Sequence, residues 1–397
     1  MAGKHIGILT GGGDVPGLNA AIKAVYHAVK AHGWIRSGSA DANLTGILRG
    51  WKGCVSMRPD RESGGWSDVV LLTDERVRTV DRYGGTFLHT SRTKPDRIRA
   101  SELPGGWRER AGDLPRAGAE HVDATDLVIR NLRELKIDCL IAIGGDDTLG
   151  YAHTLNDRGF PVVGIPKTMD NDVRGTEYCL GFATAINRAL AFINRQRTHL
   201  GSHEVVGVFR IFGRDSGFTA MGTAMAISDL RCAIPEHRFE LEDLCDLLAR
   251  DHAGHPSHYA MVVCSEGAIW KGGTLEDVGP ADAFGHRHKQ NVGEALAEEV
   301  TRRTGLPART QDLTHDLRSG DPDPLDRIIA NTYGTLAVEL VAREETGQMV
   351  CIQEGVYRHT VLPAGTAAPR TIDVETDYDV RTFRPRFETR FDRPVFF

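Results

Sequence analysis

Residues 6–19 read IGILTGGGDVPGLN, an apolar run followed by a glycine-rich turn and the start of a helix-compatible segment. The run Ile6–Leu9 predicts a buried β-strand, and a helix is expected around Asn19–Val29. Clustered glycines let the backbone approach another group closely, and backbone N–H groups at a helix N-terminus favour an anion. The stretch therefore predicts a phosphate-binding strand–turn–helix unit. The plainer alternative is a tight turn that binds nothing.

Two familiar phosphate loops do not fit this stretch. A dinucleotide-binding fingerprint needs glycine at position 16, where this chain has Pro16. A P-loop that starts at Gly12 reaches Gly17, but Leu18 stands in place of the required lysine. Neither a Rossmann dinucleotide site nor a P-loop is therefore predicted.

Apolar runs alternate with helix-period segments along most of the chain. Strands are expected over Ile137–Ile143 and Val162–Ile165, and a long helix over Glu177–Arg195. The alternation continues through Val205–Ile211, Phe218–Ile227, Leu241–Arg250, Tyr259–Cys264, Val292–Arg303 and Asp326–Val341. It predicts α/β units with parallel sheets. Residues about 50–122 and about 365–397 break this pattern. An irregular segment as long as 50–122 is expected to be functional or an insertion.

Composition narrows the class of protein. The 397 residues exceed one ordinary domain of ~100–200 residues, so two or three domains are expected. A net charge of −6 argues against a general nucleic-acid binder, which would carry a basic excess. No apolar run reaches the ~18 residues of a membrane span, and the N-terminus does not resemble a secretory signal. The seven cysteines are scattered without a Cys-x-x-Cys pair, which favours buried free thiols in a cytoplasmic protein.

Two acidic turns follow predicted strands. Residues 143–148 read IGGDDT, and adjacent Asp146 and Asp147 suit a Mg²⁺ ion bound to phosphate, or else an acidic helix N-terminus. Residues 166–172 read PKTMDND; in an extended segment Thr168, Asp170 and Asp172 would share one face. One carboxylate could then accept a hydroxyl proton, and the alternative is an Asx-rich turn without chemistry.

Together with further motifs, these turns resemble the phosphofructokinase superfamily, and more closely its pyrophosphate-dependent branch. The resemblance runs from Gly7 to about Val341, with the motifs in the family's order. It includes Gly84-Gly85-Thr86, Ser91-Arg92, Phe212-Gly213-Arg214, Pro235-Glu236, Ser265-Glu266-Gly267-Ala268 and the set Arg309, His315 and Arg318. It implies two similar three-layer α/β/α domains with mainly parallel sheets and an active site in the cleft between them. The expected division is 1–181 plus about 318–367 for the phosphoryl donor, and 182–317 plus 368–397 for the sugar phosphate.

The resemblance also implies a role for each matching residue. The Gly13 loop and Arg92 would bind the donor's phosphates, and Asp146 would hold Mg²⁺. Asp170 would be the general base on the sugar hydroxyl, with Thr168 and Asp172 beside it. Further expected contacts are Arg214 on the transferred phosphoryl group, Phe212, Gly213, Glu236 and Arg318 on the sugar, and Arg309 and His315 on its distal phosphate from a neighbouring subunit of a homodimer or homotetramer.

Two positions bear on the donor. The ATP-using branch typically has glycine where this chain has Asp147 and Lys167. Asp147 would fill the space of a nucleotide's α-phosphate and repel it, and Lys167 adds a cation for compact pyrophosphate. These residues predict a reversible, Mg²⁺-dependent transfer from pyrophosphate to fructose 6-phosphate, giving fructose 1,6-bisphosphate. The alternative for this pair is that Asp147 and Lys167 simply neutralise each other.

Other positions depart from the family pattern. Val205 replaces an arginine that contacts the distal phosphate in the family, and Arg210, expected on the same strand face as Phe212, could compensate. Another acceptor such as sedoheptulose 7-phosphate, an ATP-dependent 6-phosphofructokinase, and a catalytically idle sugar-phosphate-binding homologue therefore stay as alternatives. Lys23 and His27 stand where bacterial ATP enzymes carry effector-site arginines, which predicts weak or absent nucleotide regulation.

Overall fold

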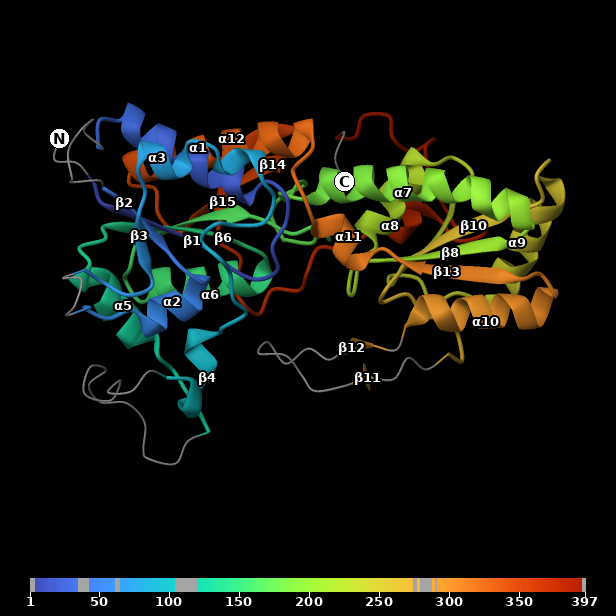
Figure 1. The fold of residues 1–397 in the computed structure, drawn as a ribbon, viewed down its shortest axis with the longest axis horizontal. Coiled ribbons are helices and arrows are strands. Elements are labelled where there is room, and N and C mark those ends of the chain that lie inside the picture. Colours follow the sequence, from blue (N-terminus) through green and yellow to red (C-terminus); the bar gives the residue numbers. More distant parts are fainter. Residues whose placement is uncertain are drawn as a thin grey trace.

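The computed structural model describes residues 4–34, 43–60, 65–103, 120–273, 277–278, 288–289 and 291–394. Two α/β lobes lie side by side and give the molecule an elongated shape (Figure 1). The glycine- and tryptophan-rich part of the predicted insertion around Gly105, Gly106 and Trp107 lies outside the described residues.

The first lobe is built on a seven-stranded sheet. From edge to edge its strands are β15 (Val356–Val361), β14 (Gln348–Gln353), β7 (Val162–Pro166), β6 (Cys139–Gly144), β1 (Ile6–Thr10), β2 (Leu44–Ile47) and β3 (Val69–Leu71). The five inner strands are parallel, whereas the edge strands β3 and β15 are antiparallel to their neighbours. The predicted, mainly parallel sheet is confirmed.

Helices cover both faces of this sheet (Figure 1). On one face lie α1 (Leu18–Ala31), α3 (Asp74–Val77) and α12 (Pro324–Ala342), and on the other α2 (Gly50–Ser56), α5 (Thr125–Glu134) and α6 (Asp146–Asp157). Successive strand side chains point to opposite faces, so Ile6 and Ile8 join the core beneath α1 and α12, and Leu9 joins the other core.

The second lobe has a four-stranded, fully parallel sheet. Its strands, in order, are β13 (Ala308–Asp312), β8 (Val206–Ile211), β10 (Ala260–Ser265) and β9 (Arg231–Ala233). The helix pair α7 (Phe182–His203) and α8 (Phe218–Ala226) packs on one face, and α9 (Leu241–Gly254) packs with α10 (Val292–Thr304) on the other. Both lobes are therefore three-layered, as the resemblance implies.

Short elements complete the fold. They are the 3-10 turns η1 (Val80–Arg82), η2 (Pro95–Arg97) and η3 (Ala100–Glu102), the small strands β4 (Ile98–Arg99), β5 (His121–Val122), β11 (Asp277–Val278), β12 (His288–Lys289), β16 (Tyr378–Asp379) and β17 (Arg384–Pro385), and the helices α11 (Thr314–Arg318) and α13 (Val374–Asp377). No described helix is long and apolar enough to cross a membrane. All seven cysteines are buried and free, which confirms the prediction for them.

Two local predictions are wrong. The helix expected from Glu177 begins at Phe182, because Gly181 has a φ of 98° and the Glu177 carboxylate instead accepts backbone N–H groups of Glu354 and Gly355. The segment 168–172 is not extended: it turns at Met169 and Asp170 and continues through a left-handed residue, Asn171, with a φ of 54°.

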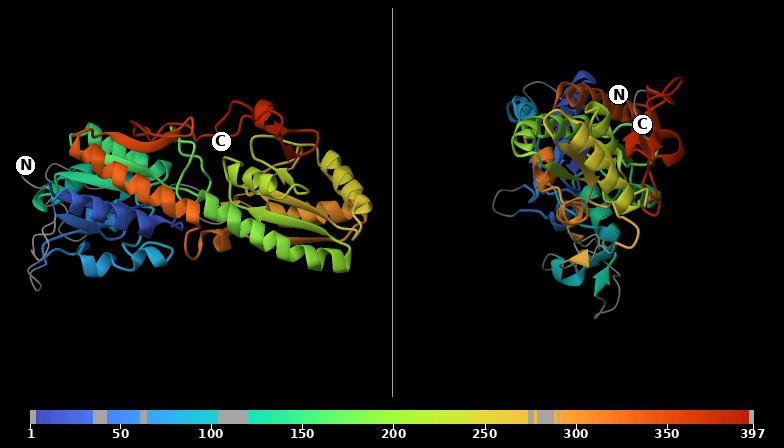
Figure 2. Two further views of the ribbon diagram at one scale, coloured as in Figure 1. Left: turned by 90° about the horizontal axis from the view of Figure 1, so that it is seen from above. Right: turned by 90° about the vertical axis from the view of Figure 1, so that its right-hand side faces the viewer.

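The C-terminal segment joins the lobes. Figure 2 shows the red end of the chain passing from the first lobe over the second. The backbone N–H of Arg370 donates to the carbonyl of Asp172 at 2.7 Å, and that of Ile372 donates to the Glu236 carboxylate at 2.9 Å. The sheets draw on residues 6–166 with 348–361 and on residues 206–312. The domain boundaries stay a prediction.

Candidate active site

A cavity of about 380 Å³ lies where the strands of both lobes end. It is lined from the first lobe by residues after β1, β6 and β7, and from the second by residues after β8 and β10. Ligands of open parallel sheets bind beyond the carboxyl ends of the strands, which is where this cavity lies. Of the predicted site residues it brings together Gly13, Arg92, Asp146, Asp147, Lys167, Thr168, Asp170, Asp172, Phe212, Arg214 and Arg318.

The glycine loop after β1 packs against two cations. The Lys167 ammonium donates to the carbonyl of Gly13 at 2.7 Å, and a Cβ on Gly13 would lie 2.3 Å from an Arg318 guanidinium nitrogen. A Cβ on Gly12 would stand 3.2 Å from Lys167 Nζ. The glycines therefore let positive charge reach the backbone, and no side chain larger than hydrogen fits at position 13 without moving Arg318.

The loop uses part of its own donor capacity. The N–H of Gly11 donates to the carbonyl of Ile143, and the N–H of Gly12 donates to the carbonyl of Ser91, both at 2.9 Å. These bonds fasten the glycine loop to strand β6 and to the segment that carries Arg92. Phosphate affinity here would therefore come from cationic side chains as well as from backbone N–H groups.

Asp147 and Lys167 do not pair with each other. The Asp147 carboxylate forms an ion pair with Lys94 at 2.7 Å, whereas the Lys167 ammonium donates to the carbonyl of Gly13. The alternative that this pair is self-neutralising is therefore wrong. Burial lowers the pKa of Lys167 to about 8, with the nearby Arg318 acting in the same direction. A bound anion would oppose both effects and hold the ammonium charged.

Buried carboxylates face these cations. Burial, followed by the charges of Asp172 and Asp147, raises the pKa of Asp146 to about 8. Burial, together with Asp172 and Glu266, raises the pKa of Asp170 well above its usual range, and Asp170 Oδ1 is buried without a hydrogen-bond partner. Carboxylates gathered at this density fit a divalent cation, because a cation would relieve their mutual repulsion. No group of three or more His, Cys, Asp or Glu side chains in the described ranges is arranged as a complete metal centre.

The turn that carries Asp170 is fixed by both lobes. Within it the N–H of Asp170 donates to Thr168 Oγ1 at 3.2 Å. From the second lobe, Ser216 Oγ donates to the carbonyl of Asp170 at 3.2 Å, and Thr219 Oγ1 donates to that of Met169 at 2.8 Å. The turn therefore keeps Thr168, Asp170 and Asp172 in one cavity, although the segment is not extended.

Asn171 explains the shape of this turn. Its amide Nδ2 donates to the carbonyl of Glu177 at 2.9 Å, and its Oδ1 accepts from the N–H of Cys179 at 2.8 Å. Asparagine tolerates the left-handed conformation and often bonds to nearby backbone, so it suits this position. Asn171 therefore fastens the turn that carries Asp170 and Asp172 to the segment 177–179.

The second lobe contributes an aromatic face and two arginines. The Arg318 guanidinium lies 4.6 Å from the centre of the Phe212 ring and 3.9 Å from the Asp14 carboxylate. The Nε of Arg214 donates to Asp215 at 3.0 Å. Gly213, between Phe212 and Arg214, has a φ of 125°, and this conformation sends both neighbours into the cavity.

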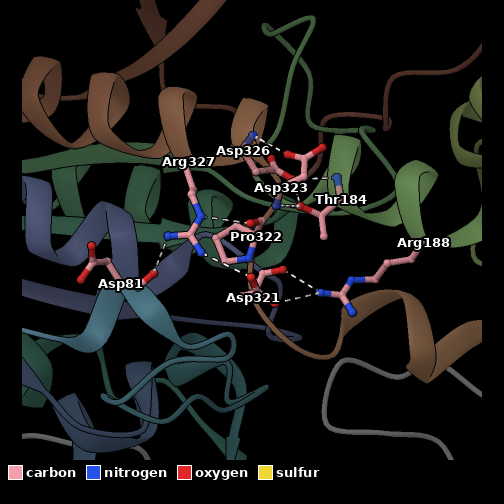
Figure 3. Close-up of polar contacts among 8 residues, drawn as sticks. All are labelled: Asp81, Thr184, Arg188, Asp321, Pro322, Asp323, Asp326 and Arg327. Carbon is pink, nitrogen blue, oxygen red and sulfur yellow. Dashed lines mark hydrogen bonds and ion pairs between the residues drawn. The ribbon is translucent and has the colours of Figure 1, made fainter. Parts of the chain in front are cut away.

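A polar network holds the chain just after Arg318. Figure 3 shows Asp321 between the guanidinium groups of Arg188 on α7 and Arg327 on α12. Arg188 also donates to the carbonyl of Asp321 at 2.6 Å, and Arg327 to that of Asp81 at 3.1 Å. This segment therefore anchors Arg318 to helices from both lobes.

Four predicted site residues do not line the cavity. Gly213 acts through the turn described above. Glu236 accepts the N–H groups of Gly217 and Ile372, both at 2.9 Å, so it fastens the C-terminal segment to the start of α8. Arg309 and His315 are exposed. The His315 ring lies beside the cavity residue Phe212, with the two ring centres 6.3 Å apart.

Arg210 does not supply an unpaired cation. It forms ion pairs with Asp312 at 2.5 Å and with Glu266 at 3.2 Å, so these two carboxylates neutralise its charge. The suggestion that Arg210 replaces the arginine missing at Val205, which is itself buried, is therefore not supported by the geometry.

Some cavity residues were not predicted. Gly365, Ala367 and Pro369 reach the cavity from the C-terminal segment, whose weak periodicity gave no signal. Asp215 and Glu266 also line it. Glu266 stands in the Ser265–Ala268 motif, which could have singled it out as the residue that follows a strand.

The chain belongs to the phosphofructokinase family. The profile of that family, Phosphofructokinase, matches residues 5–341. The chain is 35% identical over 381 residues to the pyrophosphate--fructose 6-phosphate 1-phosphotransferase of Amycolatopsis methanolica, which covers 96% of this chain and 99% of that protein. It is also 34% identical over 354 residues to the ATP-dependent 6-phosphofructokinase of Corynebacterium efficiens. That match covers 89% of this chain and 91% of the Corynebacterium protein.

Solved structures agree on the fold. A pyrophosphate-dependent phosphofructokinase from Marinobacter aquaeolei superposes with a TM-score of 0.71 over 98% of this chain and 90% of that one, at 19% identity. The family and the fold class predicted from sequence are thereby confirmed. Because relatives named for either donor are almost equally similar, identity alone does not decide between pyrophosphate and ATP.

Proposed function

We propose that this protein is a Mg²⁺-dependent phosphotransferase that moves a phosphoryl group reversibly from pyrophosphate to the 1-hydroxyl of fructose 6-phosphate. The observation that carries the donor assignment is the separation of Asp147 from Lys167. Lys167 approaches the glycine loop, where it can meet a compact phosphate, and Asp147 is held at the cavity wall by Lys94. By the family resemblance, this carboxylate would occupy the space of a nucleotide's α-phosphate, which favours the smaller donor.

The cavity residues supply what phosphoryl transfer requires. Such transfer depends on in-line positioning and charge neutralisation rather than on covalent chemistry. Asp170 would accept the proton of the attacking hydroxyl, since its raised pKa makes it a stronger base than an exposed aspartate. Arg92, Lys167 and Arg214 would neutralise the donor and the transferred group. Mg²⁺ on Asp146 would add to that neutralisation when bound.

A second subunit would complete the sugar site. Arg309 and His315 are exposed and lie outside the cavity of their own chain, as expected if they serve a neighbour's distal-phosphate site. We therefore propose a homodimer or homotetramer. The buried free thiols support the proposed cytoplasmic location.

A second acceptor has one observation in its favour. Arg210 is neutralised by Asp312 and Glu266, so the cation missing at Val205 has no evident replacement within the strand. A sugar phosphate of different length, such as sedoheptulose 7-phosphate, would place its phosphate elsewhere. Comparing kcat/KM for the two sugar phosphates, in wild type and in Val205→Arg, separates these acceptors.

The test of the proposed reaction is a coupled assay for fructose 1,6-bisphosphate with pyrophosphate, fructose 6-phosphate and Mg²⁺. Wild type should form the bisphosphate, and Asp170→Ala should lose roughly 10²–10⁴-fold in kcat while still binding substrates. A catalytically idle homologue would show no turnover in either protein. Equal turnover in both would remove Asp170 from the mechanism.

A further inference from the structure

Lys94 forms an ion pair at the wall of the active-site cavity. Its Nζ lies 2.7 Å from Asp147 Oδ1, and the two side chains are 30% and 31% exposed. Lys94 directly precedes η2, in the irregular region 50–122 that has no assigned function apart from Arg92. Asp147 lies in the first turn of α6 and lines the cavity.

Asp147 raises an electrostatic problem for the donor proposed above. A compact polyanion is attracted by Arg92 and Lys167 but repelled by a carboxylate in the same wall. Asp147 also acts on its neighbours, because it helps to raise the pKa of Asp146. An unpaired Asp147 would therefore weaken binding of pyrophosphate as well as of ATP.

Lys94 is the cation that neutralises the Asp147 carboxylate. It lies among several acids: burial raises the pKa of Asp96, the charges of Asp123 and Asp147 act in the same direction, and Lys94 opposes them. The pair also restrains Asp147, since the 2.7 Å contact with Lys94 favours this position of the carboxylate over one farther from the space that a longer donor would occupy.

We infer that Lys94 is a positioning residue for donor selection, acting through Asp147. It neutralises the carboxylate so that pyrophosphate is not repelled, and it fixes the carboxylate so that its bulk still obstructs a nucleotide. The inference rests on the proposed use of pyrophosphate. Discrimination between donors then depends on the ion pair between Lys94, just before η2, and Asp147 in α6, and Asp147 without Lys94 would not be sufficient.

A double-mutant cycle tests this inference on the full-length enzyme. The variants are Lys94→Met, Asp147→Asn and the double variant, with the dissociation constant of pyrophosphate measured by calorimetry in Mg²⁺ and KM and kcat measured in parallel. Lys94→Met should weaken pyrophosphate binding about tenfold and change kcat by less than about threefold, because it leaves an uncompensated carboxylate in the wall. Asp147→Asn should restore most of the affinity in the double variant, since the amide needs no cation.

Controls separate this effect from general loss of charge or of folding. Lys30→Met breaks the ion pair of Lys30 with Asp74, at 2.6 Å, outside the cavity and should leave pyrophosphate affinity unchanged. Lys94→Arg should retain at least half of the wild-type affinity. Unchanged affinity in Lys94→Met would overturn the inference, and so would a double variant as weak as the single one, which would mean that Lys94 binds the donor directly.

The same measurements distinguish failure of the inference from failure of the proposed function. Wild type that binds and turns over pyrophosphate, with no effect of Lys94→Met, overturns only the part assigned to Lys94. Wild type that does not bind pyrophosphate overturns both.

Discussion

Asp326 provides the sharpest test of how the two lobes are joined. Its carboxylate is fully buried and accepts four hydrogen bonds. Oδ1 accepts from Tyr178 Oη and Gly181 N, both at 2.8 Å, and Oδ2 accepts from Thr184 N at 2.8 Å and Thr184 Oγ1 at 2.5 Å. One carboxylate on α12 therefore binds the N-terminus of α7 and the strand-end segment before it.

The perturbation is Asp326→Asn, which keeps the volume and one acceptor oxygen. The amide NH₂ would face two donors, whichever way the side chain turns, so two bonds to a charged acceptor are lost. Each such bond contributes about 1.5–3 kcal/mol, or about 3–6 kcal/mol for two. Burial raises the pKa of Asp326 to about 6, so the ionised carboxylate carries a desolvation cost that asparagine lacks, and the Thr184 hydroxyl can reorient. With both offsets we expect a loss of about 2–4 kcal/mol. For a chain of this size that corresponds to a melting temperature lower by roughly 2–5 °C.

The matched control makes the same chemical change three residues away. Asp323 caps α12 by accepting the N–H of Asp326 at 2.7 Å, and asparagine caps helices as well as aspartate does. Asp323→Asn should therefore shift the melting temperature by less than about 1 °C in differential scanning calorimetry at one scan rate. Equal, small shifts for both variants would refute the argument that the buried carboxylate joins the lobes.

Three further predictions follow from other parts of the molecule. All seven cysteines should resist a thiol reagent in the native enzyme and react in denaturant, because burial raises their pKa values and hides them; rapid native labelling would contradict this. The hydrogen-bonded Arg197 lowers the pKa of Asp229 below its usual 3.8, so the pair stabilises the fold above that pH and stops doing so as pH falls through the lowered value. The difference in melting temperature between wild type and Asp229→Asn should accordingly shrink from pH 6 to pH 3, and a constant difference would contradict it. Lys167→Met should lower kcat/KM for pyrophosphate about 100-fold or more, by removing a buried charge-assisted contact to phosphate, and a loss below fivefold would remove Lys167 from the donor site.

Sequence predicted the architecture where local pattern decides it. The run Ile6–Leu9 and the following glycines form the expected strand and turn, because a continuous apolar run and the backbone freedom of glycine are local properties. The helix start at Phe182 was missed because Gly181 and the partners of Glu177, some 180 residues away in the chain, override helix propensity.

The same distinction applies to the site. Residues that follow strands β1, β6, β7 and β8 were predicted from their strand–turn motifs and from the family resemblance, and the parallel strands bring them together because their carboxyl ends share one edge. The pairing of Lys94 with Asp147 could not be read from sequence, nor could the approach of Pro369 to the cavity. Both depend on contacts between segments far apart in the chain, which carry no periodic signal.

Donor specificity of the purified enzyme tests the central claim most directly. The measurement is kcat/KM for pyrophosphate and for ATP, at saturating fructose 6-phosphate and Mg²⁺, on wild type and on Asp147→Gly/Lys167→Gly. The arrangement of Asp147 against Lys94 and of Lys167 against Gly13 predicts that wild type prefers pyrophosphate at least 100-fold, equivalent to about 2.7 kcal/mol, and that the double variant gains ATP turnover. Wild type that uses ATP faster than pyrophosphate would contradict the account.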